Sequence, residues 1–343
     1  MRLSDFDFEL PPEQIAQTPA LRRDGSRLMV LDRALGVVKT GHFQGILDYF
    51  RPGDVLVLND TRVIPARLLG RKESGGKIEV LLVRRLSGDE EVWACLTKSS
   101  KSPRPGSRLL MGEGITGTVL AGGEEPYRQI RFAVEGDFLQ AIEKVGHIPL
   151  PPYIHRDDDR LDRERYQTVY ARTAGSVAAP TAGLHFTEDL LDTLRERGVT
   201  ICPVTLHVGL GTFLPVRSED ILSHRMHEEN YFVPEATAAL VNEARARGDR
   251  IFALGTTSTR TLEYAADDKG RLVAGEGVCD LFITPGYRFR IVDALVTNFH
   301  LPRSTLLMLV SAFAGRDFVL KAYRQAVAEG FRFFSYGDCM LII

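Results

Sequence analysis

The sequence predicts an α/β protein whose body carries an inserted antiparallel β-barrel domain. Apolar strands alternate with helices over residues 1–65 and 148–343, which favours an irregular barrel-like or mostly parallel α/β body. Residues 66–147 instead contain short strands separated by glycine pairs, as in antiparallel barrels. A chain of 343 residues suits two domains, and a hydrophobic content of 44% is enough for a sizeable core. We therefore expect an α/β body formed by 1–65 and 148–343 and an inserted barrel formed by 66–147.

Residues 1–65 begin with a pattern that predicts a short helix and a β-hairpin. Proline in a first helical turn predicts a short helix at Pro11–Ile15, and Ala34-Leu35-Gly36 is typical of a hairpin turn. The further expected elements are strands Arg27–Asp32 and Val37–His42, a short helix Phe43–Phe50 and a buried strand Asp54–Asn59.

The inserted segment is predicted from alternating strands and glycine turns. Its expected strands are Arg67–Lys72, Lys77–Arg85, Val92–Thr97, Gly117–Leu120 and Tyr127–Ala133. A helix over Asp137–Val145 should follow, and the proline-rich segment 148–152 is typical of a stiff exit linker.

The C-terminal part returns to strand–helix alternation. Thr187–Gly198 has a complete helix outline, with Thr187 as N-cap, acids in the first turn and Gly198 as the stop. Further expected helices are Pro234–Gly248, the segment from Thr256 through Arg260, Arg303–Ala314 and Asp317–Gly330. Further expected strands are Val199–His207, Tyr231–Val233, Arg250–Gly255, Phe331–Tyr336 and Met340–Ile343. Ligands of such folds bind at the carboxyl ends of the strands, where the polar loops of this chain lie.

Charge and cysteine content narrow the class of protein. The net charge is −2, but residues 62–108 hold eleven Lys/Arg against five Asp/Glu. This local excess indicates either a surface that binds a phosphate backbone or a solvated surface of mixed charge. The four cysteines are far apart without metal-ligand spacing, so we expect buried, reduced thiols and no metal site. The acidic N-terminus lacks a signal peptide and no apolar run reaches 18 residues, so a cytoplasmic protein without a membrane partner is expected.

Two segments place an imidazole among glycines and hydroxyls. Residues 180–187 are Pro-Thr-Ala-Gly-Leu-His-Phe-Thr, and residues 205–213 are Thr-Leu-His-Val-Gly-Leu-Gly-Thr-Phe. Such segments let the backbone approach a ligand closely beside a titratable ring. They make His185 and His207 candidate catalytic residues, with Thr181, Gly209 and Gly211 as candidate substrate contacts. The Gly-Leu-Gly of the second segment lacks the third glycine and the helix of a dinucleotide fingerprint, so a Rossmann site is rejected.

Three further segments are candidates for substrate contacts or proton transfer. Thr256, Thr257, Ser258 and Arg260 follow an apolar strand at a helix start, which suits an anion or a ribose, although simple capping also explains hydroxyls there. His227 and Glu228 suggest acid–base work, although a solvated charged loop or a metal ligand pair are alternatives. Asn298, His300 and Arg303, between the strand near residue 297 and the next helix, are expected substrate contacts. The alternative for His300 is a purely structural role.

A last polar segment, Asn59-Asp60-Thr61-Arg62, follows the first buried strand. An Asx-type turn explains its first two residues but not Arg62, which could bind a carboxylate or phosphate.

Together these blocks resemble the S-adenosylmethionine:tRNA ribosyltransferase-isomerases of queuosine biosynthesis. The matching blocks are Asn59–Leu68, Pro180–Thr187, His207–Phe213, Met226–Glu228, Gly255–Glu263, Thr297–Gly315 and Phe334–Ile342, in order along nearly the whole chain. The resemblance implies an α/β body with an inserted β-barrel. It also implies transfer of the ribosyl part of S-adenosylmethionine to 7-aminomethyl-7-deazaguanine at the tRNA wobble position, isomerisation to epoxyqueuosine, and release of adenine and methionine.

That reaction needs a base near the ribose, an acid for the leaving adenine and a cation for the methionine carboxylate. His185, His207, His227 and Glu228 are the candidates for the base. Arg62 or Arg303 would bind the carboxylate, and Arg260 or the hydroxyls of 256–259 would stabilise oxyanion character. No resident cofactor is expected because S-adenosylmethionine is consumed, and we expect a monomer. The alternatives are a nucleoside-processing enzyme acting on a free small molecule, with the barrel as a lid, and a non-catalytic RNA-binding module.

Overall fold

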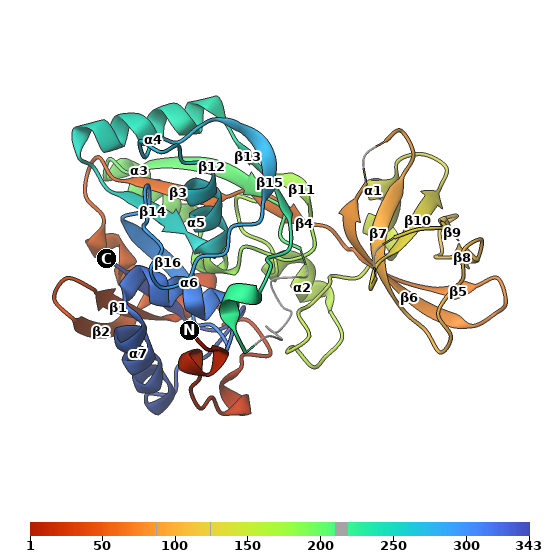
Figure 1. Cartoon of the computed structure of the whole chain (residues 1–343), viewed down its shortest axis with the longest axis horizontal. Coiled ribbons are helices and arrows are strands. Elements are labelled where there is room, and N and C mark those ends of the chain that lie inside the picture. The colour runs from red at the N-terminus through yellow and green to blue at the C-terminus, as the bar shows by residue number, and fades with distance from the viewer. Residues whose placement is uncertain (87, 124, 210–218) are drawn as a thin grey trace.

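Figure 1 shows a large α/β body joined to a smaller β-barrel that stands apart from it. This computed structural model describes residues 1–86, 88–123, 125–209 and 219–343. Both chain ends lie in the body. The chain enters the barrel through β4 (Thr61–Val63), which pairs in parallel with β11 (Thr173–Ser176) on the body side.

The body is built on a nine-stranded sheet. Its order is β15 (Gly275–Cys279), β13 (Glu229–Val233), β12 (Thr200–Leu206), β3 (Val55–Asn59), β14 (Ile251–Leu254), β16 (Ala294–Asn298), β17 (Cys339–Ile342), β1 (Arg27–Asp32) and β2 (Val37–His42). The central run β12-β3-β14-β16 is parallel throughout, whereas the outer pairs β15-β13, β13-β12 and β1-β2 are antiparallel. The carboxyl ends of the four central strands therefore lie at one edge.

Both faces of the sheet are buried, which explains its apolar central strands. Alternate residues of β3, Val55 and Val57, pack in the core cluster that also holds residues of α4, α5, α6 and α7. Their neighbours Leu56 and Leu58 pack on the other face, in the cluster with residues of η4 and α3. The period of two along a strand thus separates two core layers.

All the described α-helices except α2 lie where the sequence predicted helices. The α-helices are α1 (Phe138–Val145), α2 (Arg160–Arg165), α3 (Glu188–Glu196), α4 (Glu235–Arg247), α5 (Gly255–Tyr264), α6 (Thr305–Ala314) and α7 (Arg316–Ala328). The 3-10 helices are η1 (Leu3–Phe6), η2 (Pro12–Gln14), η3 (Arg23–Gly25), η4 (Phe43–Tyr49), η5 (Thr181–His185) and η7 (Ile221–Ser223). Thr187 caps α3 by accepting from the Leu190 N–H, as predicted.

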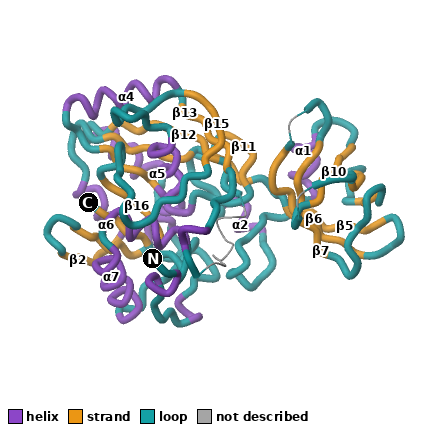
Figure 2. Tube along the Cα trace, viewed as in Figure 1, coloured by secondary structure: helices purple, strands orange, loops and turns teal. Residues whose placement is uncertain are grey.

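The inserted segment forms a closed antiparallel barrel. Its strand order is β10 (Arg128–Ala133), β7 (Val92–Lys98), β6 (Lys77–Arg85), β5 (Arg67–Lys72), β8 (Arg108–Leu110) and β9 (Thr116–Val119). Figure 2 shows this part as strand and loop apart from α1, whose Phe138 and Ile142 complete the barrel core. The predicted α/β body with an inserted antiparallel β-barrel is confirmed, whereas the exact boundaries at 66 and 147 remain a prediction.

One predicted strand, Phe331–Tyr336, is wrong. Only Phe333 makes an isolated bridge, to Ile15, and Phe334 adopts a left-handed φ of 74°. The Asp338 carboxylate accepts the N–H groups of Arg332 and Arg27, so a side chain takes the place of a strand partner. The segment becomes a turn that leads into β17.

Several elements lacked a prediction, including β8, β11, β15 and α2. Strand β8 has only three residues, too few for an alternating pattern. Helix α2 is almost entirely charged, so no apolar stripe indicates it, although its capping box between Asp159 and Asp162 was a usable signal.

Candidate active site

A small cavity lies at the carboxyl edge of the parallel strands. It measures about 50 Å³ and is lined by Ala179, Pro180, Thr181, Ala182, Val208, Gly255, Thr256, Thr257, Thr297, Asn298, Phe299, His300, Leu306, Phe334 and Ser335. Most of these residues lie at or just after the ends of β12, β14 and β16 or shortly before β17, as expected for ligand sites in such sheets, and residues 179–182 come from the segment between β11 and α3. Five predicted residues line it, namely Thr181, Thr256, Thr257, Asn298 and His300.

A wide cleft adjoins this cavity at Val208, which lines both. The cleft measures about 1080 Å³ and lies between the barrel, which contributes residues such as Arg84, Arg85, Trp93 and Tyr127, and the body. Its body side holds the predicted residues His207, Gly209, His227 and Glu228. The structure therefore places the two sets of predicted residues in two adjoining spaces rather than in one pocket.

His207 is the imidazole best placed to meet a ligand in the cleft. It follows β12, its side chain is half-buried, and its Nδ1 lies 2.8 Å from Thr61 Oγ1. Burial lowers the pKa of His207, and the nearby Asp60 carboxylate opposes that shift. A Cβ on Gly175, whose φ is 145°, would lie 2.9 Å from the His207 ring, so only glycine leaves the ring its place.

His185 lies behind the small cavity rather than in its wall. Its Nδ1 is 2.8 Å from Ser26 Oγ and its Nε2 is 3.1 Å from Asn298 Nδ2. The Asn298 amide also accepts from Thr181 Oγ1 at 2.9 Å through its oxygen, which makes its NH₂ the donor to His185. Burial lowers the pKa of His185 to about 3, with Arg332 adding to the shift. His185 thus holds Asn298, which in turn faces the cavity.

His300 lines the small cavity but is itself anchored. Its Nε2 lies 2.9 Å from Thr297 Oγ1, and burial lowers its pKa to about 3. The ring is therefore neutral at physiological pH.

Arg260 is buried among protein partners and lines neither space. Its guanidinium pairs with Glu229 and its Nε donates to the Leu281 carbonyl at 3.0 Å. Glu229 Oε1 accepts from the Gly209 N–H at 3.0 Å, so the ion pair connects α5 to the loop after His207. The predicted contact of Arg260 with substrate oxyanions has no direct geometric support, and the neighbouring Ser258 donates to the Leu254 carbonyl inside the helix.

Arg62 and Arg303 do not face either space. Arg62 pairs with Glu143 at 2.6 Å, and Arg303 pairs with Asp7 at 2.5 Å. Both guanidinium groups are about half exposed, which places them on the surface. Gly211 lies outside the described residues.

The sequence argument overlooked Glu229 and the barrel wall. Glu228 is exposed and meets Arg84 of the barrel at 3.7 Å, whereas Glu229, one residue on, is buried at the start of β13. The period of two along that strand is the signal that separates the two carboxylates. Trp93 and Tyr127 could not be assigned to the cleft without knowing how the barrel faces the body.

Metal and membrane features were also sought in the described residues. Among them no group of three or more His, Cys, Asp or Glu is placed to hold a metal ion. The helices that the structure describes include none long and apolar enough to cross a membrane. The four cysteines are buried and unpaired.

The fold and these spaces define an α/β protein with a cavity at the carboxyl edge of its central parallel strands and an inserted barrel as the opposite wall of the adjoining cleft. A family model described as "Queuosine biosynthesis protein" matches residues 3–342, and the chain belongs to this family. The predicted membership is thereby confirmed.

Individual relatives match over their whole length. The S-adenosylmethionine:tRNA ribosyltransferase-isomerase of Syntrophotalea carbinolica is 70% identical, and that of Geobacter sulfurreducens is 58% identical, each covering 100% of both chains. A crystal structure of S-adenosylmethionine tRNA ribosyltransferase from Thermotoga maritima is 44% identical, with a TM-score of 0.57, over 99% of this chain and 100% of that chain.

Proposed function

We propose that this chain is a transferase and isomerase that transfers and isomerises the ribosyl part of S-adenosylmethionine onto tRNA in queuosine biosynthesis. The full-length identity of 70% to a protein named for this activity carries the proposal. The finer proposal is that the acceptor is 7-aminomethyl-7-deazaguanine at the wobble position, that epoxyqueuosine-tRNA is formed, and that adenine and methionine are released.

The two adjoining spaces suit two substrates of different size. A cavity of about 50 Å³ holds only part of a nucleoside donor, so the rest of the donor must extend past Val208 toward the cleft. The cleft of about 1080 Å³ can take a base splayed out of a single-stranded loop, with Trp93 and Tyr127 as aromatic neighbours. Arg84 and Arg85 of β6 on the cleft wall suit an RNA backbone.

Among the four candidate bases, we propose His207 for proton abstraction. Its ring lines the cleft, and its lowered pKa keeps the lone pair available at neutral pH. In the tautomer that we propose, Nδ1–H donates to Thr61, whose hydroxyl faces the Thr173 carbonyl at 3.5 Å, and Nε2 carries the lone pair. His185 already uses both ring nitrogens, and His227 and Glu228 are exposed.

No resident cofactor is proposed, because S-adenosylmethionine enters as a substrate and is consumed. One chain supplies both spaces, which supports action as a monomer. Localisation in the cytoplasm stays a prediction.

The test follows adenine release from labelled S-adenosylmethionine, with and without tRNA bearing the deazaguanine. The expected result is RNA-dependent release, and His207→Gln should lower kcat by about 100-fold or more, the usual contribution of a positioned base. His227→Gln, which removes an exposed imidazole of the same cleft, is the matched comparison and should retain most of the activity. Release that proceeds equally without RNA would favour the free small-molecule alternative, and full activity of His207→Gln would exclude that residue as the base.

A further inference from the structure

The first turn of α5 forms one wall of the small cavity. Gly255, Thr256 and Thr257 are its first three residues, and all three line the cavity. Gly255 has a φ of 91°, which lets the chain turn directly from β14 into the helix. No side chain caps this ten-residue helix, so its first-turn N–H groups and the positive end of its dipole have no side-chain acceptor where the helix borders the cavity.

A hydroxyl in this wall lacks a partner. Thr257 is 9% exposed, and its Oγ1 is buried without a hydrogen bond. Two other hydroxyls near this helix start donate to backbone carbonyls four residues back, Ser258 to Leu254 and Thr259 to Gly255. A buried hydroxyl without a partner costs free energy unless a ligand satisfies it.

The cavity is otherwise electrically neutral. Its described lining contains no Lys, Arg, Asp or Glu, and the one imidazole there, His300, is neutral because burial lowers its pKa to about 3. The positive potential at the described lining comes from helix N-termini, namely the first turn of α5, which no side chain caps, and Leu306 in the first turn of α6, which Ser304 caps. The arginines predicted to bind the methionine carboxylate, Arg62 and Arg303, are held by Glu143 and Asp7 outside the cavity.

We infer that the first turn of α5, with the Thr257 hydroxyl, is the subsite for the carboxylate of S-adenosylmethionine. This inference rests on the proposed function and adds which group of the donor enters the small cavity. A carboxylate fits the dimensions, accepts from first-turn N–H groups, and gives the Thr257 hydroxyl an acceptor. The adenosine end of the donor then extends past Val208 toward His207.

The test compares the affinities of wild type and Thr257→Val for S-adenosylmethionine and for its decarboxylated analogue, by calorimetry. Wild type should bind the donor at least about tenfold more tightly than the analogue, the scale of a hydrogen bond to a charged group. Thr257→Val should lose about tenfold or more in affinity for the donor and less than about twofold for the analogue. Thr257→Ser, which keeps the hydroxyl, should bind the donor like wild type.

Thr261→Val is the matched control. It removes a hydroxyl one turn further along α5 that donates to the Thr257 carbonyl and does not line the cavity. It should leave both affinities unchanged, while circular dichroism reports whether each variant is folded. Equal weakening of both ligands by Thr257→Val, or equal affinity of wild type for both, overturns the inference. If Thr257→Val does not fold, the wild-type comparison decides alone. Absence of RNA-dependent adenine release from wild type would instead refute the proposed function.

Discussion

The buried, neutral histidines make the stability of the body depend on pH. Burial lowers the pKa of His185 to about 3, whereas an unfolded histidine has its ordinary value of 6.5. The folded body therefore binds fewer protons than the unfolded chain between these values. Stability is complete above pH 6.5 and is lost as the pH falls below 6.5 toward 3.

The magnitude follows from the two pKa values. Between pH 7 and pH 5 the linkage relation gives a loss of about 2 kcal/mol for His185. Any folded pKa below about 4 gives nearly the same loss, because the folded ring is then neutral at pH 5. His300, with its pKa also lowered to about 3 by burial, doubles the expected loss.

The perturbation is His185→Gln. The new amide reaches Asn298 but loses the bond to Ser26 and the ring contact with Phe43, so the variant is less stable than wild type at pH 7. Because glutamine does not titrate, the difference in unfolding free energy between wild type and His185→Gln should be smaller by about 2 kcal/mol at pH 5 than at pH 7. His42→Gln, which removes an exposed imidazole by the same substitution, is the control variant measured in parallel.

The assay is urea unfolding followed by circular dichroism at 222 nm. The helices α3 to α7 lie in the body, whereas the one tryptophan of the chain, Trp93, is in β7 of the barrel. Tryptophan fluorescence therefore follows the barrel and separates the two parts if they unfold independently. A gap between His185→Gln and wild type that stays constant within about 0.5 kcal/mol from pH 7 to pH 5 refutes the reasoning.

Two further predictions concern charge. Glu229→Gln leaves the Arg260 guanidinium buried without its counter-ion and should lower the free energy of unfolding by about 3–5 kcal/mol. Glu228→Gln, which changes an exposed neighbour, should alter the free energy of unfolding by no more than about 0.5 kcal/mol. Equal effects of the two substitutions in urea unfolding would contradict this prediction. The affinity for tRNA should fall steeply as the salt concentration rises. The double substitution Arg84→Ala with Arg85→Ala should reduce the slope of log affinity against log salt concentration by about 1–2, whereas Arg316→Ala on α7 should leave that slope unchanged. An affinity of wild type that does not change with salt would argue against a contact between the cleft and the RNA backbone.

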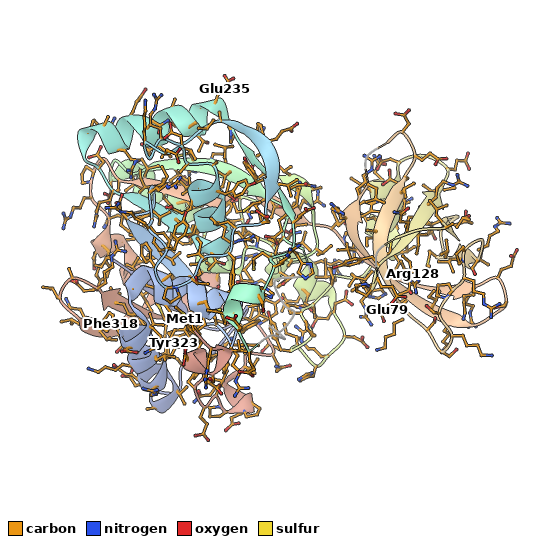
Figure 3. All side chains as sticks on the ribbon, viewed as in Figure 1. Met1, Glu79, Arg128, Glu235, Phe318 and Tyr323 are labelled. Atoms are coloured by element: carbon orange, nitrogen blue, oxygen red, sulfur yellow. The ribbon has the colours of Figure 1, made fainter. Side chains whose placement is uncertain are left out.

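The fold could be predicted because its signals are local. Glycine pairs, caps and strand–helix alternation predict the barrel and the body, and the strands that flank the hairpin at Gly36 have the expected bounds. Polar loops at carboxyl ends of parallel strands predict that Asn298 and Thr257 meet, and both line the small cavity. Figure 3 shows Glu79 and Arg128 on the barrel and Phe318 on the side of the body away from it.

The electrostatic details could not be predicted, because they depend on which charges lie opposite one another in three dimensions. At least five of the eleven basic residues in 62–108 form ion pairs with carboxylates, including Arg84 with Glu228 across the cleft. A count of charges along the chain therefore overstates the positive potential of the barrel. Arg62 and Arg303 likewise lie outside the cavities because Glu143 and Asp7 hold them.

The donor that we propose carries a positive charge, which would account for the neutral walls of the small cavity. The sulfonium of S-adenosylmethionine carries a positive charge, so an arginine or a protonated imidazole in the wall would repel the group next to the reacting carbon. The first turn of α5 attracts the carboxylate with partial charges that fall off within about one turn, whereas a full cation would also act on the sulfonium. The neutral His300 and the placement of Arg260 behind Glu229 have the same consequence. The cavity can therefore bind the carboxylate of the donor without placing a full positive charge beside its sulfonium.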